Sequence, residues 1–200
     1  VLQSTPYPLE FGANSCSSAE LTFQADFAVW QVAFDGCTNV PYLMYQGEQY
    51  NLLQLHIHSP SEYTFGGAEH AAGIHFVHIK DGTAGELLVV GVLFDVTEYG
   101  SNLEKFWSVL GTGSNTTDVA FTTNPYEMLP LSPGFTHFLG SLTTPPCSEG
   151  VKWIVMNDPS YMGRRQIEEY RRAVGIEFGN TNRPIQPINN RDIKYVALEG

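Results

Sequence analysis

No stretch of the 200-residue chain approaches the roughly 20 consecutive apolar residues that a membrane-spanning helix needs. Its first residues, Val1 to Pro6, have neither the basic start nor the apolar core of a secretory signal peptide. Basic residues are scarce, since 10 Lys and Arg stand against 21 Asp and Glu and give a net charge of −11. A surface of that sign repels nucleic acid and anionic lipid. The sequence therefore predicts no membrane span and no nucleic-acid partner.

Cysteine is also rare, and the three cysteines, Cys16, Cys37 and Cys147, include no Cys-x-x-Cys pair. This spacing argues against a thiolate zinc site and a thioredoxin-type motif. Cys16 and Cys37 flank two strand-like runs that a turn near residues 26–27 would fold into a hairpin, bringing both ends within disulfide reach. A Cys16–Cys37 disulfide and two buried free thiols are both compatible with this pattern. Cys147 has no evident partner.

The sequence Asn115-Thr116-Thr117 is an N-glycosylation sequon. Sequons are common by chance, so Asn115 adds only a little to the candidate disulfide. Together they favour a secreted glycoprotein in an extracellular or periplasmic-type compartment.

Apolar residues make up 42% of the chain, enough for a sizeable core, and no repeat or linker divides it. We expect a single domain over residues 1–200. The run at 86–95 is continuously apolar, which predicts a central strand buried on both faces. Further strands are predicted at 9–11, 21–25, 28–34, 42–45, 51–58, 73–79, 135–142 and 151–155.

Helices are few. Residues 101–104 have the capping-box pattern and Gly111 suits a C-cap, which predicts a short helix over 102–110. Residues 164–174 have helical composition with one apolar face, and the polar segment 180–191 is predicted to be an extended loop. The predicted fold is mainly β (α+β), with a large, mostly antiparallel central sheet and short peripheral helices.

Five of the six histidines fall between positions 56 and 78. His56 and His58 are two apart in a predicted strand and therefore share one face. A third imidazole from the 73–79 strand would complete three nitrogen donors with an open fourth position, the arrangement of a catalytic zinc site. His75 and His78 face opposite sides of their strand, so only one can join, and the pattern does not say which. Structural, hydrogen-bonded histidines are the competing interpretation, and the better one for His70 and His137.

A zinc site of this kind needs acceptors behind its ligands. Gln54 is two residues before His56 and shares its face, so its amide oxygen is a candidate. Glu69 is a candidate buried carboxylate between the two strands, or else an ordinary surface residue. The stretch Ser141 to Cys147 combines two threonines with two prolines, which predicts a rigid loop. It is either a plain turn or the holder of a hydroxyl that orients a metal-bound nucleophile.

These residues together resemble an α-class carbonic anhydrase, in order and at compatible spacing from about Phe23 to Arg191. The matching segments are Gln54-Leu55-His56-Ile57-His58, Glu69-His70, His75-Phe76-Val77-His78, Ser141 to Cys147, Trp153, Asn182-Arg183-Pro184-Ile185-Gln186-Pro187 and Asn190-Arg191. Each is weak alone, but the combination is specific.

The resemblance implies that His56, His58 and His75 bind Zn²⁺, and that zinc-bound hydroxide attacks carbon dioxide to give bicarbonate and a proton. Carbonic anhydrase is the reference example of such a site, so the lowering of the water pKa to about 7 is carried over from the family. Thr143 would accept a hydrogen bond from the hydroxide and donate its own to Glu69. Weak ester hydrolysis is an expected side activity.

The resemblance also implies a substrate pocket. Thr144 would contact bicarbonate, and an apolar wall would hold carbon dioxide, a small uncharged molecule. The wall residues are Val77, Val89, Leu142, Val151 and Trp153.

Four departures from the family accompany these matches. Ala28 occupies the position of the proton-shuttle histidine, which predicts slow, buffer-dependent proton release. Gly73 replaces a glutamate behind the third ligand, which predicts weaker zinc retention, and Phe138 replaces a tyrosine. The N-terminal segment with its Gln-Ser-Pro motif, which carries the usual partner of Cys147, is not evident, so we expect a truncated or processed form.

Two other functions compete with the enzyme. A catalytically weak or silent relative would serve as a binding or structural module, but such relatives usually lose a zinc histidine and all three survive here. A different zinc hydrolase lacks sequence support, since no Gly-x-Ser-x-Gly motif is present.

Overall fold

The architecture comes from a computed structural model. It describes residues 9–12, 14, 16–98, 101, 103–104, 107, 116–121, 124–131, 134–175 and 180–197, with the backbone alone at 17 and 116–121. The candidate glycosylation site Asn115 and most of the predicted helix 102–110 lie outside these residues.

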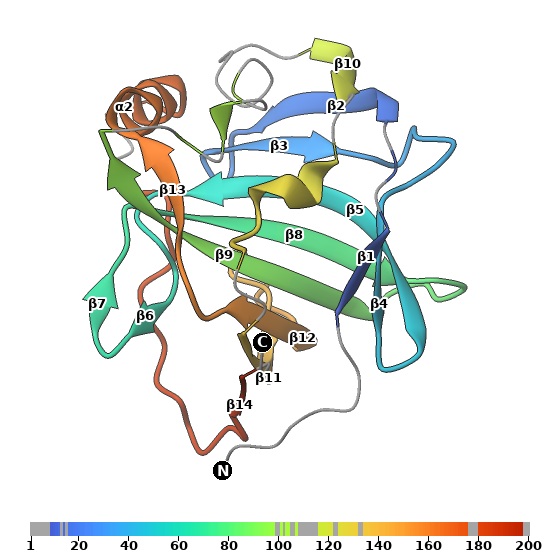
Figure 1. Ribbon diagram of the computed structural model, residues 1–200, viewed down its shortest axis with the longest axis vertical. Helices are drawn as coiled ribbons and strands as arrows, with labels where there is room; N and C mark the ends of the chain where they lie inside the picture. Colours follow the sequence, from blue (N-terminus) through green and yellow to red (C-terminus); the bar gives the residue numbers. More distant parts are fainter. Residues whose placement is uncertain are drawn as a thin grey trace.

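A curled, 12-stranded mixed sheet forms the body of the molecule (Figure 1). Its main path runs in the order β10-β2-β3-β5-β8-β9-β12-β11-β14, with β4 beside β5, β1 beside β4 and β13 beside β9. The bounds are β1 Glu10–Gly12, β2 Cys16–Gln24, β3 Val29–Ala33, β4 Tyr42–Tyr45, β5 Glu48–His58, β8 Ala72–Lys80, β9 Leu87–Thr97, β10 Thr116–Phe121, β11 Phe135–Ser141, β12 Glu149–Met156, β13 Ser160–Gly163 and β14 Lys194–Val196. Pairing is antiparallel except where β12 and β13 run parallel to β9. The mostly antiparallel, mainly β fold is confirmed.

Few elements lie off the sheet. The helix α2 (Arg164–Ala173) and the 3-10 helix η2 (Pro125–Met128) are peripheral, and β6 (Thr64–Phe65) and β7 (Ala68–Glu69) form a separate small hairpin. In Figure 1 this hairpin projects from the side of the sheet. Within the described residues, no helix is both long and apolar enough to cross a membrane.

Most sequence predictions of single elements are confirmed. β9 is buried over most of its length, as its continuous apolar run predicts, and α2 ends within one residue of its expected end. The Cys16–Cys37 disulfide is present, with the Cα atoms 5.4 Å apart, because β2 and β3 pair as the two arms of a hairpin. The short strands of the β6–β7 hairpin, β13 and β14 were not predicted, because two to four residues carry too little periodicity to signal a strand.

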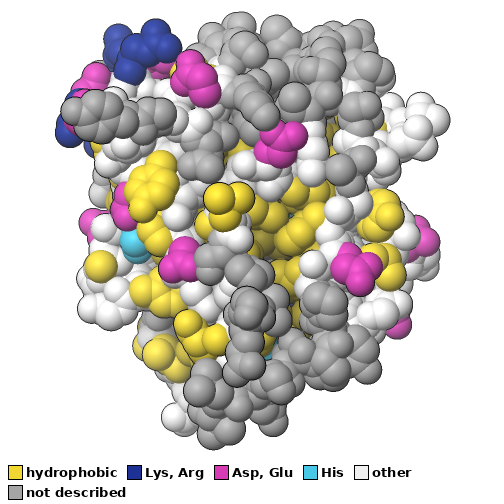
Figure 2. Space-filling model, in the orientation of Figure 1, with side chains coloured by type: hydrophobic (Ala, Val, Ile, Leu, Met, Phe, Trp, Pro, Cys, Tyr) yellow, Lys and Arg dark blue, Asp and Glu magenta, His cyan; other side chains and the backbone are white. Residues whose placement is uncertain are grey.

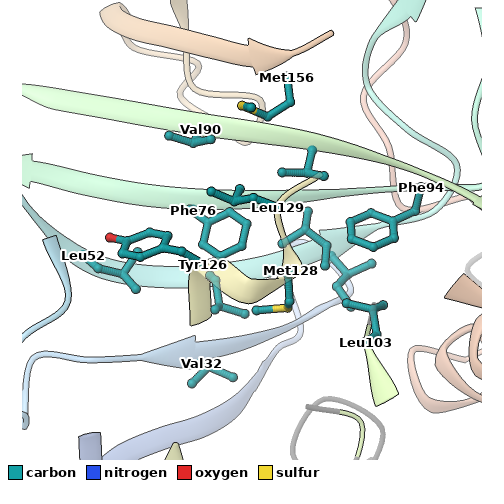
Figure 3. Packing of buried hydrophobic residues seen from close by; sticks show 14 of the residues in the cluster. Val32, Leu52, Phe76, Val90, Phe94, Leu103, Tyr126, Met128, Leu129 and Met156 are labelled. Atoms are coloured by element: carbon teal, nitrogen blue, oxygen red, sulfur yellow. The ribbon is translucent and has the colours of Figure 1, made fainter. Parts of the chain in front are cut away.

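The two faces of the sheet bury different apolar clusters. The larger cluster includes Ile74 and Phe76 of β8, and Figure 3 shows Tyr126, Met128 and Leu129 beside Phe76 and Val90. Residues two apart in a strand share a face, so the alternate positions of β8 point to the opposite side. There the smaller cluster forms from Val77, Val89, Val151 and Trp153.

The surface reflects the acidic composition. Figure 2 shows Asp and Glu scattered over one face, apolar side chains gathered near its centre, and Lys and Arg grouped near α2. The basic group is consistent with the four arginines that α2 carries.

Candidate metal centre

Three buried histidines converge on the face of the sheet that carries the smaller apolar cluster. His56 and His58 project from β5, and His75 stands directly opposite His56 in the antiparallel pairing of β5 with β8. One ring nitrogen from each lies within 4.8 Å of the others. The structure therefore places His75, and not His78, beside His56 and His58, a choice that periodicity left open.

The hydrogen bonds of the first two imidazoles fix where their protons are. Nδ1 of His56 lies 2.7 Å from the amide oxygen of Gln54, the contact expected from their two-residue spacing. Nδ1 of His58 lies 2.7 Å from the carbonyl oxygen of Thr181. Because these oxygens only accept, each Nδ1 carries the proton and each Nε2 presents a lone pair.

The third imidazole is turned the other way. Nδ1 of His75 lies 3.2 Å from Nε2 of His56. Two nitrogens bound to one tetrahedral zinc at about 2.0–2.1 Å lie about 3.3 Å apart, so this pair has the spacing of two zinc ligands. Nε2 of His58 is buried and has no hydrogen-bond partner among the described residues. This donor set fits zinc.

Burial keeps two of the three imidazoles, those of His56 and His75, neutral. Burial lowers the pKa of His56 well below its usual value, and the neighbouring His58 lowers it further. Burial likewise depresses the pKa of His75, with contributions from His58 and His56. Neutral imidazoles are the protonation state that coordinates a metal.

A buried carboxylate lies against the histidines, but it is Glu62 and not Glu69. Oε1 of Glu62 accepts a 2.6 Å hydrogen bond from the backbone N–H of Arg183. Its Oε2 lies 3.6 Å from Nε2 of His58 and 3.7 Å from Nε2 of His75, and no described residue forms a hydrogen bond with it.

The prediction of Glu69 as a buried carboxylate is wrong. Glu69 is exposed in β7, because the β6–β7 hairpin carries it away from the sheet (Figure 1). The missed signal was Glu62 itself, a carboxylate only four residues after His58.

The other histidines have structural surroundings. Nδ1 of His70 lies 2.9 Å from a carboxylate oxygen of Asp95, which agrees with its predicted structural role. Nε2 of His78 lies 2.9 Å from the hydroxyl of Tyr126 on the opposite face of β8. His137 is half-buried and packs near the ring of Tyr45.

A cleft of about 410 Å³ opens beside the histidines. His58, Glu62, Thr143 and Thr144 line it, so the Ser141–Cys147 loop does face the site. Ala28 also lines it, with a left-handed φ of 50° in the β2–β3 turn. The remaining lining residues are Ala25, Asp26, Phe27, Pro145, Asn180, Thr181, Asn182 and Arg183.

Residues 181–183 form a strap along the segment that follows β5. The Thr181 hydroxyl accepts from the Ser59 N–H at 3.0 Å, in addition to the contact of its carbonyl with His58. The Asn182 amide donates to the carbonyl of Ser61 at 3.3 Å. With the Arg183 contact to Glu62, the strap fixes a candidate ligand and the buried carboxylate together. The sequence predicted a loop here but gave no sign of these contacts.

An apolar wall adjoins the site. Val77, Val89, Val151 and Trp153 are buried together, with Leu142 packed against them. Trp153 lies beside His75, with ring centroids 5.0 Å apart, and donates its indole N–H to the Ser141 carbonyl at 3.0 Å. These five residues are the predicted wall.

Two aromatic residues complete this wall. Phe138 stacks on Trp153, and Tyr63, which the sequence did not single out, packs against His75 with centroids 5.8 Å apart. Burial and the neighbouring Glu62 raise the pKa of Tyr63 well above its usual value, so its hydroxyl stays protonated.

Comparisons with known proteins agree with this geometry. A family profile described as eukaryotic-type carbonic anhydrase matches residues 2–197. A carbonic anhydrase of Neisseria gonorrhoeae is 35% identical over 149 residues, which cover 74% of this chain and 57% of that protein. The chain thus spans little more than half the length of the first curated relatives it matches.

Solved structures extend the likeness to nearly the whole chain. The α-carbonic anhydrase of Thermovibrio ammonificans, in complex with the inhibitor sulfanilamide, has a TM-score of 0.78 at 32% identity, covering 97% of this chain and 80% of that one. A dioscorin complexed with ascorbate has a TM-score of 0.86 at 25% identity, covering 100% and 82%.

Proposed function

The chain belongs to the eukaryotic-type carbonic anhydrase family, and from that premise we propose that it hydrates carbon dioxide reversibly to bicarbonate and a proton. Zn²⁺ is the proposed cofactor, with His56, His58 and His75 as its ligands. The observation that carries the proposal is the convergence of three buried imidazoles beside an open cleft. A zinc ion bound there would lower the pKa of a coordinated water and supply hydroxide near neutral pH.

The threonine loop and Glu62 would orient the nucleophile. Thr143 and Glu62 line the same cleft, and Glu62 is anchored by the backbone N–H of Arg183. We assign to Thr143 a hydrogen bond accepted from the nucleophile and one donated to the carboxylate of Glu62, which takes the role first given to Glu69. Because the fixed Thr143 hydroxyl would only accept from the nucleophile, it would turn a lone pair of the nucleophile toward the substrate carbon. Thr144, on the same loop, is proposed to contact bicarbonate.

The apolar wall would hold the substrate. Carbon dioxide is small and uncharged, so a dry surface of buried side chains suits it, and Val77 and Trp153 present that surface next to His75. The remaining members of the proposed wall are Val89, Leu142 and Val151.

Proton release is the step for which the cleft offers no histidine at the shuttle position, which Ala28 occupies. Ala28 lines the cleft but has no titratable group, and the sequence contains no histidine before His56. We propose that buffer molecules take the proton directly, so turnover depends on buffer concentration.

Metal analysis combined with a carbon dioxide hydration assay tests the proposal. Wild-type protein should contain one zinc per chain and hydrate carbon dioxide. Thr143→Ala should keep the zinc and lose activity by roughly 100-fold or more, the usual loss when a group that orients a reacting atom is removed. Stoichiometric zinc without hydration by the wild type would favour a catalytically silent binding module instead.

That alternative is supported by two observations. Gly73 leaves His75 without a side chain behind it on its own strand, and one similar structure is named a dioscorin rather than a carbonic anhydrase. A shared fold does not carry activity. The complete histidine set favours the enzyme, and weak ester hydrolysis remains an expected side activity.

The Cys16–Cys37 disulfide supports an oxidising location, so we propose a secreted, extracellular or periplasmic-type compartment. Glycosylation at Asn115 remains a prediction. We also propose that residues 1–200 act as one domain, because the main sheet joins β-strands from residue 10 to residue 196.

A further inference from the structure

One of the three imidazoles lacks a partner for its second ring nitrogen. Metal-binding histidines almost always donate their other N–H to an acceptor, which fixes the ring and raises its basicity. His56 and His58 do so, to Gln54 and Thr181. His75 does not: its Nε2 is buried and without a hydrogen-bond partner among the described residues.

The strand that carries His75 offers no acceptor. The residue two before His75 on the same face of β8 is Gly73, which has no side chain. On β5 the corresponding place before His56 is taken by Gln54. The acceptor for His75 must therefore come from another segment.

Counting protons singles out one atom. Nε2 of His58 has no proton to give, because Nδ1 of that ring holds it against the Thr181 carbonyl. Nδ1 of His75 lies 3.2 Å from Nε2 of His56, and if both nitrogens bind zinc, the ring proton of neutral His75 has to sit on Nε2. Oε2 of Glu62 lies 3.7 Å from that nitrogen and has no hydrogen-bond partner of its own in the described part of the chain. With zinc bound, a buried donor and a buried acceptor would thus face each other, neither with another hydrogen-bond partner among the described residues.

We propose that Glu62 is the positioning carboxylate of His75, and that its Oε2 accepts the Nε2–H when zinc is bound. This inference rests on the proposed zinc site and deepens it. Closing the gap from 3.7 Å to an ordinary hydrogen bond of about 2.9–3.2 Å needs a movement of only roughly 0.5–0.8 Å. Glu62 would then serve two donors, the imidazole of His75 and the hydroxyl of Thr143, through one oxygen that has two lone pairs.

The anchoring of Glu62 suits this task. The backbone N–H of Arg183 holds its Oε1 at 2.6 Å, and the side chain is 2% exposed. The carboxylate is thus fixed by the strap, outside the strand whose ligand it would orient. A chain with Gly73 can retain a complete set of ligand partners in this way.

Glu62→Gln tests the inference with little change in shape. Its amide oxygen can still accept from the Arg183 N–H, which leaves an NH₂ group facing the N–H of His75. Glu69→Gln makes the same chemical change at an exposed site and is the matched control. In zinc-loaded protein, we expect Glu62→Gln to release zinc to a chelator roughly 10–100-fold faster than wild type, and Glu69→Gln to release it at the wild-type rate.

NMR of the histidine ring N–H protons separates positioning from a general loss of structure. In Glu62→Gln, the Nε2–H signal of His75 should shift or be lost to exchange, while the Nδ1–H signals of His56 and His58 stay in place. Unchanged signals from all three rings, with unchanged zinc release, would overturn the inference. In zinc-loaded wild type, a His75 Nε2–H that exchanges rapidly with water would overturn it without any variant.

Rescue provides an independent arm. A Cβ at Gly73 would meet Ser61 atoms at 3.6 Å, which is ordinary contact, so Gly73→Glu can supply a carboxylate from β8 itself. Adding Gly73→Glu to Glu62→Gln should restore slow zinc release, and Gly73→Ala should not. If wild type binds no zinc, the proposed function fails. If wild type binds zinc and Glu62→Gln holds it equally well, only this inference fails.

Discussion

The two strands that build the candidate metal centre support their histidines differently. β5 carries both His56, with its own acceptor Gln54, and His58, whose acceptor is the Thr181 carbonyl of the strap, each at 2.7 Å. β8 brings His75 with Gly73 behind it, and among the described residues the nearest acceptor to its Nε2 is Oε2 of Glu62 at 3.7 Å. The histidines of β5 thus find their acceptors in β5 itself and in the strap. The histidine of β8 depends on the Glu62 carboxylate from the loop between the two strands.

This difference shows that the position of a candidate ligand and the orientation of its ring depend on different contacts. The antiparallel register of β5 and β8 alone sets His75 opposite His56, and it would do so with any residue at position 73. Orientation of the ring needs an acceptor, and that acceptor can come from any segment that reaches the site. A substitution can therefore change the orientation of the imidazole ring without changing the position of the histidine.

Removal of a ligand should have the largest effect on both strands. An apparent zinc binding energy of about 10–16 kcal/mol shared by three histidines gives about 3–5 kcal/mol each, so His58→Ala should weaken zinc affinity by roughly 100- to 10,000-fold. His75→Ala should cost a similar amount. Chelator competition measures both. If His75→Ala costs less than tenfold, β8 contributes no real ligand and the comparison fails.

Removal of the acceptor on β5 should leave His56, like His75, without an acceptor from its own strand for its second ring nitrogen. We expect Gln54→Ala to lower zinc affinity by roughly 10–100-fold, because the Nδ1–H of His56 loses its partner. Gln49→Ala, on the same strand and hydrogen-bonded to Asn51, is the control and should leave affinity unchanged. If both substitutions lowered zinc affinity equally, the loss would come from general disturbance of β5 and not from the missing acceptor of His56.

A histidine from outside both strands should change proton release without changing zinc binding. Ala28 lines the cleft with φ 50°, a conformation that histidine tolerates better than most residues. Wild-type kcat should rise with buffer concentration. Ala28→His should raise kcat in dilute buffer by about tenfold or more and remove most of that dependence. A wild-type rate that is equal in dilute and concentrated buffer would contradict this.

Replacing His78, which lies on the face of β8 opposite to His75, should change the stability of the fold and leave zinc affinity unchanged. Burial lowers the pKa of His78 to about 4, below the 6.5 of an unfolded histidine. The unfolded state therefore binds more protons between these values, and the stability that neutral His78 provides is lost as pH falls from 6.5 towards 4. At pH 5 the loss is about 2 kcal/mol.

Urea unfolding of metal-free wild type and His78→Gln at pH 7.5 and pH 5 measures this loss as a change in their difference. The titration of the other histidines cancels between the two proteins. A difference in unfolding free energy that is equal at both pH values would contradict the assignment. Zinc affinity at pH 7.5 should be the same in both, since His78 lies on the opposite face from His75.

How much the sequence could predict depended on whether the signal was local. Spacing of two residues placed His56, His58 and Gln54 on one face of β5, and the apolar run predicted the buried β9. The position of the third candidate ligand depends on the register between strands, which periodicity does not contain. The strap at 181–183 and the carboxylate of Glu62 depend on contacts between residues more than 100 positions apart.

The error over Glu69 has the same origin. Both Glu62 and Glu69 lie in the connection between β5 and β8, and composition does not reveal which one turns inwards. The β6–β7 hairpin decides it by carrying Glu69 into solvent.

Anomalous diffraction at the zinc edge, from crystals of zinc-loaded protein, tests the central claim most directly. The account predicts one strong peak at about 2.0–2.1 Å from Nε2 of His56, Nε2 of His58 and Nδ1 of His75. A peak elsewhere, or coordination of the zinc by Nε2 of His75, would contradict it.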